Sequence, residues 1–112
     1  MHKVFVYGTL KRGHSNHLLL STSNFVKESV TKGEMRSLGG FPAIHLNSNR
    51  TIHGEIYEVD DTVLERLDRL EGVPYFYQRN KVETPDGPVW VYTIDEAEIR
   101  DLPLIKDGIW RD

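Results

Sequence analysis

The stretch TVLERLDRLEGVP, residues 62–74, predicts the one main helix of the chain, over residues 62–71. Its leucines recur every three residues, as they do on one face of a helix. The residues at its start that can act as the N-cap are Asp60, Asp61 and Thr62. Thr62 and Glu65 have the spacing of a capping box, and the glycine and proline after the last turn stop the helix.

Strands are expected on both sides of this helix. Runs of apolar residues bounded by turn residues predict strands at 3–7, 32–37, 43–46, 52–59, 76–83 and 88–94. The strand at 32–37 is the only one expected within residues 25–37. A short helical turn is expected at 17–20. Turns at residues 47–49 and 84–87 join 43–59 and 76–94 into hairpins. The fold class is therefore α+β, with a small mixed, largely antiparallel β-sheet or β-barrel and one main helix, and residues 1–112 form a single domain.

The composition argues against several classes of protein. Fourteen basic and 17 acidic residues give a net charge of −3, which is not the charge of a nucleic-acid-binding domain. The longest strongly apolar run, residues 18–20, is far shorter than the roughly 20 residues that span a bilayer, and we expect no signal sequence. The absence of cysteine removes disulfides, thiolate nucleophiles and zinc–sulfur sites. We expect a cytoplasmic monomer with neither a nucleic-acid nor a membrane partner.

Glu71 is the first candidate for a chemical role. It lies four residues after Leu67, so it shares the apolar face of the helix and points toward the core. It also lies in the last helical turn, where the helix dipole disfavours a negative charge. Both effects raise the pKa of a carboxyl group toward neutral, where it can take up and return protons. The alternative is that the helix has already ended, which leaves Glu71 exposed or paired with Arg79.

The loop YGTLKRG, residues 7–13, is the second candidate. It continues a strand apolar enough to be buried on both faces, and that strand stops at Gly8. Such a loop can turn several backbone N–H groups toward one point, which suits a carboxylate, a phosphate or a developing oxyanion. The spacing of Gly8 and Gly13 resembles a phosphate-binding P-loop, but His14 stands where that motif needs lysine. A plain tight turn with a solvated basic tip remains the alternative.

Other residues give weaker signals. His14 and His17 could share a helical face, but no third metal ligand accompanies them, and we expect no metal site. A group of aromatic residues could line a pocket or form the core and rim of the sheet: Tyr75, Phe76, Tyr77, Trp90 and Tyr92.

The blocks that stand out along the chain are VFVYGTLKRG at 4–13, GEIYEV at 54–59, LDRLEG at 67–72, Pro74, and YQR at 77–79. In this order they resemble the gamma-glutamylcyclotransferase-like (AIG2-like) superfamily, and they are most similar to its gamma-glutamylamine cyclotransferase branch. Thr9 occupies a position where the other branches usually carry serine. The resemblance covers residues 3–93, and we recognise no family motif beyond Ile94.

The resemblance implies a compact α+β fold around a small barrel, and a reaction without a cofactor. It makes Glu71 the catalytic acid and base. The segment that it implies for substrate binding consists of Tyr7, Gly8, Thr9 and Leu10. Tyr7 and Tyr77 would position the substrate through a hydroxyl or a ring. Arg79 would orient Glu71 or bind a carboxylate, unless it is a surface charge.

The reaction that the resemblance implies is an intramolecular aminolysis. The α-amine of a gamma-glutamyl group attacks the side-chain amide carbonyl, which gives 5-oxoproline and a free amine. Glu71 would accept a proton from the α-ammonium group and later deliver one to the leaving nitrogen. The expected partner is a small gamma-glutamyl amine or gamma-glutamyl amino acid. A non-catalytic module that binds an amine or amino acid through the same residues is the alternative function.

Overall fold

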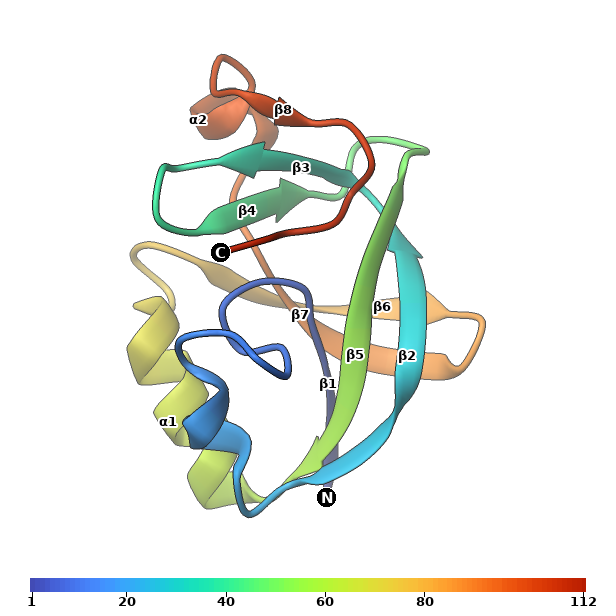
Figure 1. The fold of residues 1–112 in the computed structure, drawn as a ribbon, viewed down its shortest axis with the longest axis vertical. Coiled ribbons are helices and arrows are strands. Elements are labelled where there is room, and N and C mark those ends of the chain that lie inside the picture. Colours follow the sequence, from blue (N-terminus) through green and yellow to red (C-terminus); the bar gives the residue numbers. More distant parts are fainter.

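A five-stranded sheet is the larger of two sheets in the computed structural model, which describes residues 1–112 (Figure 1). In spatial order its strands are β2 (Asn24–Lys32), β5 (Thr51–Val59), β1 (His2–Val6), β7 (Gly87–Thr93) and β6 (Gln78–Thr84). Only β1 and β7 run parallel, and the other neighbours are antiparallel. Because β1 is the central strand, the loop that follows it begins in the middle of the molecule.

The smaller sheet has three antiparallel strands. Their order is β4 (Pro42–His45), β3 (Glu34–Ser37) and β8 (Leu104–Ile105). Two short helices complete the fold, the 3₁₀ helix η1 (His17–Leu20) and α2 (Glu96–Ile99). The fold is therefore α+β with a mixed, mostly antiparallel arrangement, as the sequence predicts. The larger sheet does not close into a barrel, because its edge strands β2 and β6 are not hydrogen-bonded to each other.

The main helix, α1 (Asp61–Glu71), begins one residue before the predicted start and ends where predicted. Asp60 is the N-cap, and its Oδ1 accepts a hydrogen bond from the backbone N–H of Val63 at 2.8 Å. The capping box predicted for Thr62 is therefore wrong. Gly72 ends the helix in the left-handed conformation, at φ +67°. No helix of the structure is long and apolar enough to cross a membrane.

The hairpin predicted over residues 43–59 is wrong. β4 pairs with β3, whereas β5 lies between β2 and β1. The cause is that residues 25–37 contain two strands and not one, and the chain changes sheet at Gly33. A Cβ at Gly33 would lie 2.8 Å from the carbonyl oxygen of His45 in β4 and 3.4 Å from Cγ1 of Ile52 in β5, so the two sheets meet there. The second predicted hairpin, β6 with β7, is confirmed.

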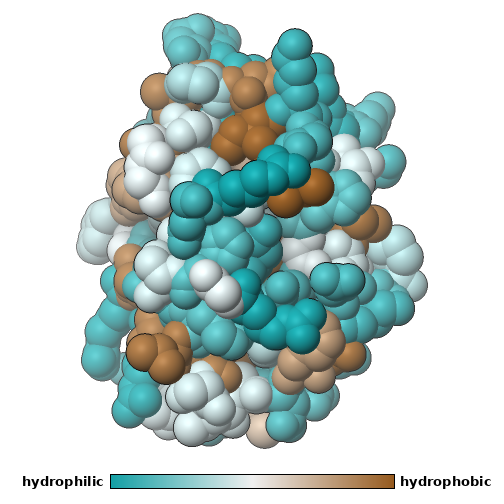
Figure 2. All heavy atoms as spheres, in the orientation of Figure 1, coloured by the Kyte–Doolittle hydropathy of each residue, from teal (hydrophilic) through white to brown (hydrophobic).

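The core lies on both faces of β1, as its apolar sequence predicts. Val4 and Val6 belong to a cluster with the buried face of α1, and Phe5 belongs to a second cluster with residues of β5 and β7. β5 approaches β1 closely at Gly54, where a Cβ would lie 2.4 Å from the carbonyl oxygen of Val6. On the face shown in Figure 2, hydrophilic residues predominate and hydrophobic ones form small separate patches.

The C-terminal segment after β7 packs back onto both sheets (Figure 1). β8 pairs with β3, and Trp110 is 8% exposed within the second core cluster. Three further apolar residues of this segment, Leu102, Leu104 and Ile105, are half-buried. This packing brings the chain end to the loop that follows β1.

Candidate active site

A cavity of about 310 Å³ lies where three segments meet: the loop after β1, the end of α1, and the turn between β3 and β4. The predicted site residues that line it are Tyr7, Gly8, Thr9, Leu10, Glu71 and Tyr77. Nine of its 16 lining residues are hydrophobic, and Glu71 is the only charged one. The fold thus brings together the two candidates that the sequence singles out, the loop and the helix-end carboxylate.

Glu71 is the last residue of α1, and its side chain is half-buried at the cavity. Burial raises the pKa of its carboxyl group from 4.5 to about 7. Arg79 does not line the cavity, and its Nε lies 3.4 Å from Asp68 Oδ1. The guanidinium of Arg79 also lies over the ring of Trp90, 4.4 Å from the centroid. Glu71 is therefore neither fully exposed nor paired with Arg79, and it can exchange protons near neutral pH.

The loop after β1 offers unused hydrogen-bond donors. The backbone N–H groups of Gly8, Thr9 and Leu10 donate to no acceptor in the protein. The loop is nevertheless held in shape, because Asn16 donates from its backbone N–H to Thr9 O at 2.8 Å and from Nδ2 to Thr9 Oγ1 at 3.0 Å. A Cβ at Gly8 would lie 2.8 Å from Cγ of Pro42, so this position requires glycine. Ordered donors without acceptors suit a negatively charged ligand group.

The tyrosines predicted to contact substrate are fixed by their hydroxyl groups. The Tyr7 hydroxyl donates to Tyr92 O at 2.7 Å and accepts from the Ile44 N–H at 3.3 Å. The Tyr77 hydroxyl donates to Pro42 O at 2.6 Å. Burial raises the pKa of both tyrosines above the usual value, so both stay protonated. These bonds connect β4 to the walls of the cavity and fix the positions of both rings.

Sequence reasoning missed the contacts between the loop and the C-terminal segment. Lys11 Nζ donates to the carbonyl oxygen of Trp110 at 3.0 Å, although Lys11 is only 9% exposed. The backbone N–H of Ser15 donates to Asp112 Oδ2 at 3.1 Å, and the indole of Trp110 donates to Asp112 Oδ1 at 2.8 Å. We call these three contacts the tail clasp. No local pattern signals the first two contacts, because their partners are 99 and 97 residues apart in the chain.

A buried carboxylate of β5 also holds the loop after β1. Glu55 is 8% exposed, and its Oε1 accepts from the Arg12 N–H at 2.9 Å and from the Tyr57 hydroxyl at 2.9 Å.

The two histidines considered as metal ligands face different partners. His14 Nδ1 lies 3.2 Å from Asp112 Oδ2, and His17 Nδ1 lies 2.9 Å from Leu10 O. No group of three or more His, Cys, Asp or Glu residues could hold a metal ion.

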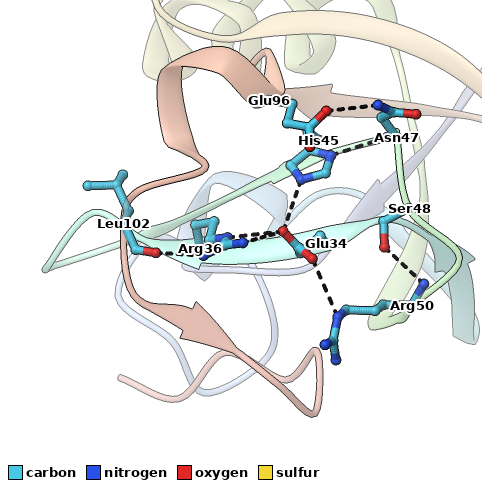
Figure 3. Close-up of polar contacts among 8 residues, drawn as sticks. All are labelled: Glu34, Arg36, His45, Asn47, Ser48, Arg50, Glu96 and Leu102. Carbon is cyan, nitrogen blue, oxygen red and sulfur yellow. Dashed lines mark hydrogen bonds and ion pairs between the residues drawn. The ribbon is translucent and has the colours of Figure 1, made fainter.

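A separate polar cluster surrounds Glu34 in the smaller sheet (Figure 3). Arg36, His45 and Arg50 all point at this carboxylate, with His45 Nε2 at 3.2 Å and Arg50 Nε at 3.4 Å. The hydrogen bond from Arg36 lowers the pKa of Glu34. Arg36 also donates to Leu102 O at 2.9 Å. The cluster therefore joins β3 and β4 to the C-terminal segment and lies outside the cavity.

The raised pKa of Glu71 makes protein stability depend on pH. The folded protein binds the Glu71 proton more tightly than the unfolded chain does. The free energy of unfolding therefore falls as pH rises from 4.5 to about 7, and the loss is complete above that range. We expect Glu71→Gln to exceed the wild type in stability at pH 8 by about 1–3 kcal/mol and to match it at pH 4.5. Urea unfolding at both pH values measures this, and equal stability at pH 8 would contradict the raised pKa.

Comparison with known proteins identifies the family of this chain. The family model described as "Gamma-glutamyl cyclotransferase, AIG2-like" matches residues 4–112. A Vibrio cholerae protein, provisionally named as a gamma-glutamylcyclotransferase, is 42% identical over 111 residues, which cover 97% of this chain and 95% of the relative. The gamma-glutamylcyclotransferase family protein YtfP of Escherichia coli is 32% identical, and the match covers 98% of this chain and 96% of YtfP.

Solved structures share the fold. An AIG2-like protein from Mus musculus superimposes with a TM-score of 0.80 at 27% identity, covering 100% of this chain and 95% of that one. The solution structure of Escherichia coli ytfP gives a TM-score of 0.75 at 32% identity, covering 98% of this chain and 96% of that one. The family match also includes the C-terminal segment, in which we recognised no motif. The chain therefore belongs to the gamma-glutamyl cyclotransferase, AIG2-like family, and it is a gamma-glutamylcyclotransferase-like enzyme.

Proposed function

We propose that this enzyme closes the gamma-glutamyl group of a small amide to 5-oxoproline and releases the free amine. The observation that carries the proposal is the pairing of two features in one cavity. Glu71 supplies a carboxyl group whose pKa is about 7, and the loop after β1 supplies backbone donors that no protein group uses. Together they provide a proton acceptor and a site for negative charge, which are the two needs of this reaction.

Glu71 moves the protons. The substrate α-amine arrives as an ammonium ion, which has no lone pair for attack, and the Glu71 carboxylate removes one proton from it. The freed amine then attacks the gamma-carbonyl carbon and forms a five-membered ring. The C–N bond to the leaving group breaks as Glu71 returns a proton to that nitrogen. The ring nitrogen gives up its second proton to the released amine, which leaves as an ammonium ion. Because nucleophile and carbonyl belong to one molecule, the enzyme chiefly has to fold and hold the substrate.

The loop after β1 holds the negative charge. The substrate carries an α-carboxylate, and the carbonyl oxygen becomes negative when the amine attacks. The cavity has no cationic side chain. The unused N–H groups of Gly8, Thr9 and Leu10 would therefore bind the carboxylate or the oxyanion. One such donor to an oxyanion contributes about 3–4 kcal/mol to transition-state stabilisation.

The direct test is 5-oxoproline release from a panel of gamma-glutamyl compounds. The panel contains gamma-glutamyl-methylamide, gamma-glutamyl-alanine, ε-(gamma-glutamyl)lysine and glutathione, and chromatography measures both products. We expect equal amounts of 5-oxoproline and amine from at least one member. If the protein binds panel members in calorimetry without releasing product from any of them, it is the non-catalytic binding module instead.

The reaction rate should depend on the ionisation of Glu71. As a base, Glu71 must be deprotonated in the free enzyme, so kcat/KM should rise about tenfold per pH unit below pH 7 and level off above it. Initial rates between pH 5 and pH 8 at low substrate concentration measure this profile. An inflection near 4.5, the ordinary value for glutamate, would contradict a raised pKa of Glu71 as the base.

We also infer that the enzyme acts as a monomer in the cytoplasm. The chain is acidic and has no long apolar run, which supports a monomer. The absence of cysteine is consistent with a reducing compartment.

A further inference from the structure

We propose that the amine released by this enzyme is small and apolar, and that it carries no charged group other than its reacting nitrogen. We propose further that Phe41 and Phe76 select this amine. This inference rests on the proposed function and concerns the leaving-group side of the same cavity.

The first argument is the lack of charge in the cavity. Apart from Glu71, none of the lining residues carries a charge, and Glu71 is needed for the reacting amine. The cations of the neighbouring loop point elsewhere. Lys11 is bound to the Trp110 carbonyl, and the guanidinium of Arg12 lies over the Phe25 ring, 4.1 Å from its centroid. A leaving group with an ammonium or carboxylate would lose water there and gain no partner, which is unfavourable.

The second argument is the apolar rim of the cavity. Phe41, from the turn between β3 and β4, and Phe76, from the segment before β6, lie edge to face with centroids 6.0 Å apart. They are 36% and 49% exposed, and Leu70 beside them is 42% exposed. Large apolar side chains that stay exposed around a cavity mark a surface that binds apolar ligand atoms. Phe41 and Phe76 form what we call the aromatic rim.

The third argument is the orientation of the substrate. Tyr7 and Tyr77 are about 95% buried, at 5% and 4% exposure, so they form the inner wall, whereas the aromatic rim is at the opening. The backbone N–H groups of the loop bind the charged gamma-glutamyl end of the substrate. The leaving group at the other end therefore points toward the rim. The cavity volume of about 310 Å³ is at the small end for ligand sites, which favours a short leaving group.

A matched pair of substrates isolates the charge. Gamma-glutamyl-n-pentylamide and gamma-glutamyl-(4-aminobutyl)amide have equal chain lengths and differ by a terminal methyl or ammonium group. We expect kcat/KM for 5-oxoproline release to be at least about tenfold higher for the pentylamide. An equal or reversed preference overturns the inference but leaves the proposed function intact. Absence of release from both and from gamma-glutamyl-methylamide overturns the proposed function itself.

Variants of the aromatic rim test the residues. Phe76→Ala and Phe41→Ala should lower the ratio of kcat/KM for the pentylamide to kcat/KM for the methylamide by about tenfold. Phe76→Leu should restore most of this ratio. The matched control is Tyr75→Ala, because Tyr75 is 97% exposed and does not line the cavity, and it should leave both substrates unchanged. An equal loss for both substrates in the two phenylalanine variants would show a structural role and overturn the assignment.

Discussion

Replacing Glu71 with glutamine should lower kcat for 5-oxoproline release by about 10²–10⁴-fold. The amide keeps the size of the side chain but cannot accept a proton from the substrate ammonium group. Glu71 makes no ion pair with Arg79, so its replacement breaks no salt bridge there. Product release measured at substrate saturation gives the change in kcat, and circular dichroism checks that the variant is folded.

Glu65→Gln is the control for this experiment. Glu65 lies on the same helix but is exposed and pairs with Arg69 at 2.8 Å, outside the cavity. Its replacement should leave kcat within about twofold of the wild type, because exposed pairs of this kind contribute only about 0.3–0.5 kcal/mol. If Glu71→Gln retained wild-type turnover, the proton would have to move through another group, and the assignment of Glu71 would fail.

Gly54→Ala should destabilise the protein by about 3 kcal/mol or more. The new methyl group would lie 2.4 Å from Val6 O and 2.6 Å from Cζ of Phe5. Neither neighbour can give way easily, because one is a backbone atom of the central strand and the other is a fully buried ring. Separation of β5 from β1 would also displace the loop that begins two residues after Val6. Thermal unfolding measures the loss.

Gly40→Ala is the matched control for stability. No atom lies within 4 Å of a Cβ built at Gly40, and its φ lies outside the left-handed region. We expect its melting temperature to remain close to that of the wild type. If Gly54→Ala melted at the same temperature as Gly40→Ala, the close approach of the two strands would not be a constraint on the fold.

The local features of this fold follow from the sequence. The end of the helix is predicted correctly because glycine and proline act on their neighbours and need no distant partner. The interior position of Glu71 follows from the helical repeat for the same reason. The β6–β7 hairpin is also local, since the turn at 84–87 joins strands adjacent in the chain.

The pairing of strands distant in the chain does not follow from the sequence. A hairpin over 43–59 would agree with the turn signal at 47–49. β5 instead pairs with β2 on one side and β1 on the other, which gives it backbone hydrogen bonds along its full length. The role predicted for Arg79 depends on a contact of the same kind. The Arg79 guanidinium pairs with Asp68 and not with Glu71. The spacing of Glu71 and Arg79 in the sequence does not reveal that Asp68 is within reach.

The tail clasp has a consequence for folding during protein synthesis. Lys11 and Ser15 of the loop bind Trp110 and Asp112, which the ribosome adds about 100 residues later. β1 likewise pairs with β7, about 85 residues later in the chain. Closing such long loops is entropically expensive and slow. The loop can therefore make these contacts only after residues 110–112 have been synthesised.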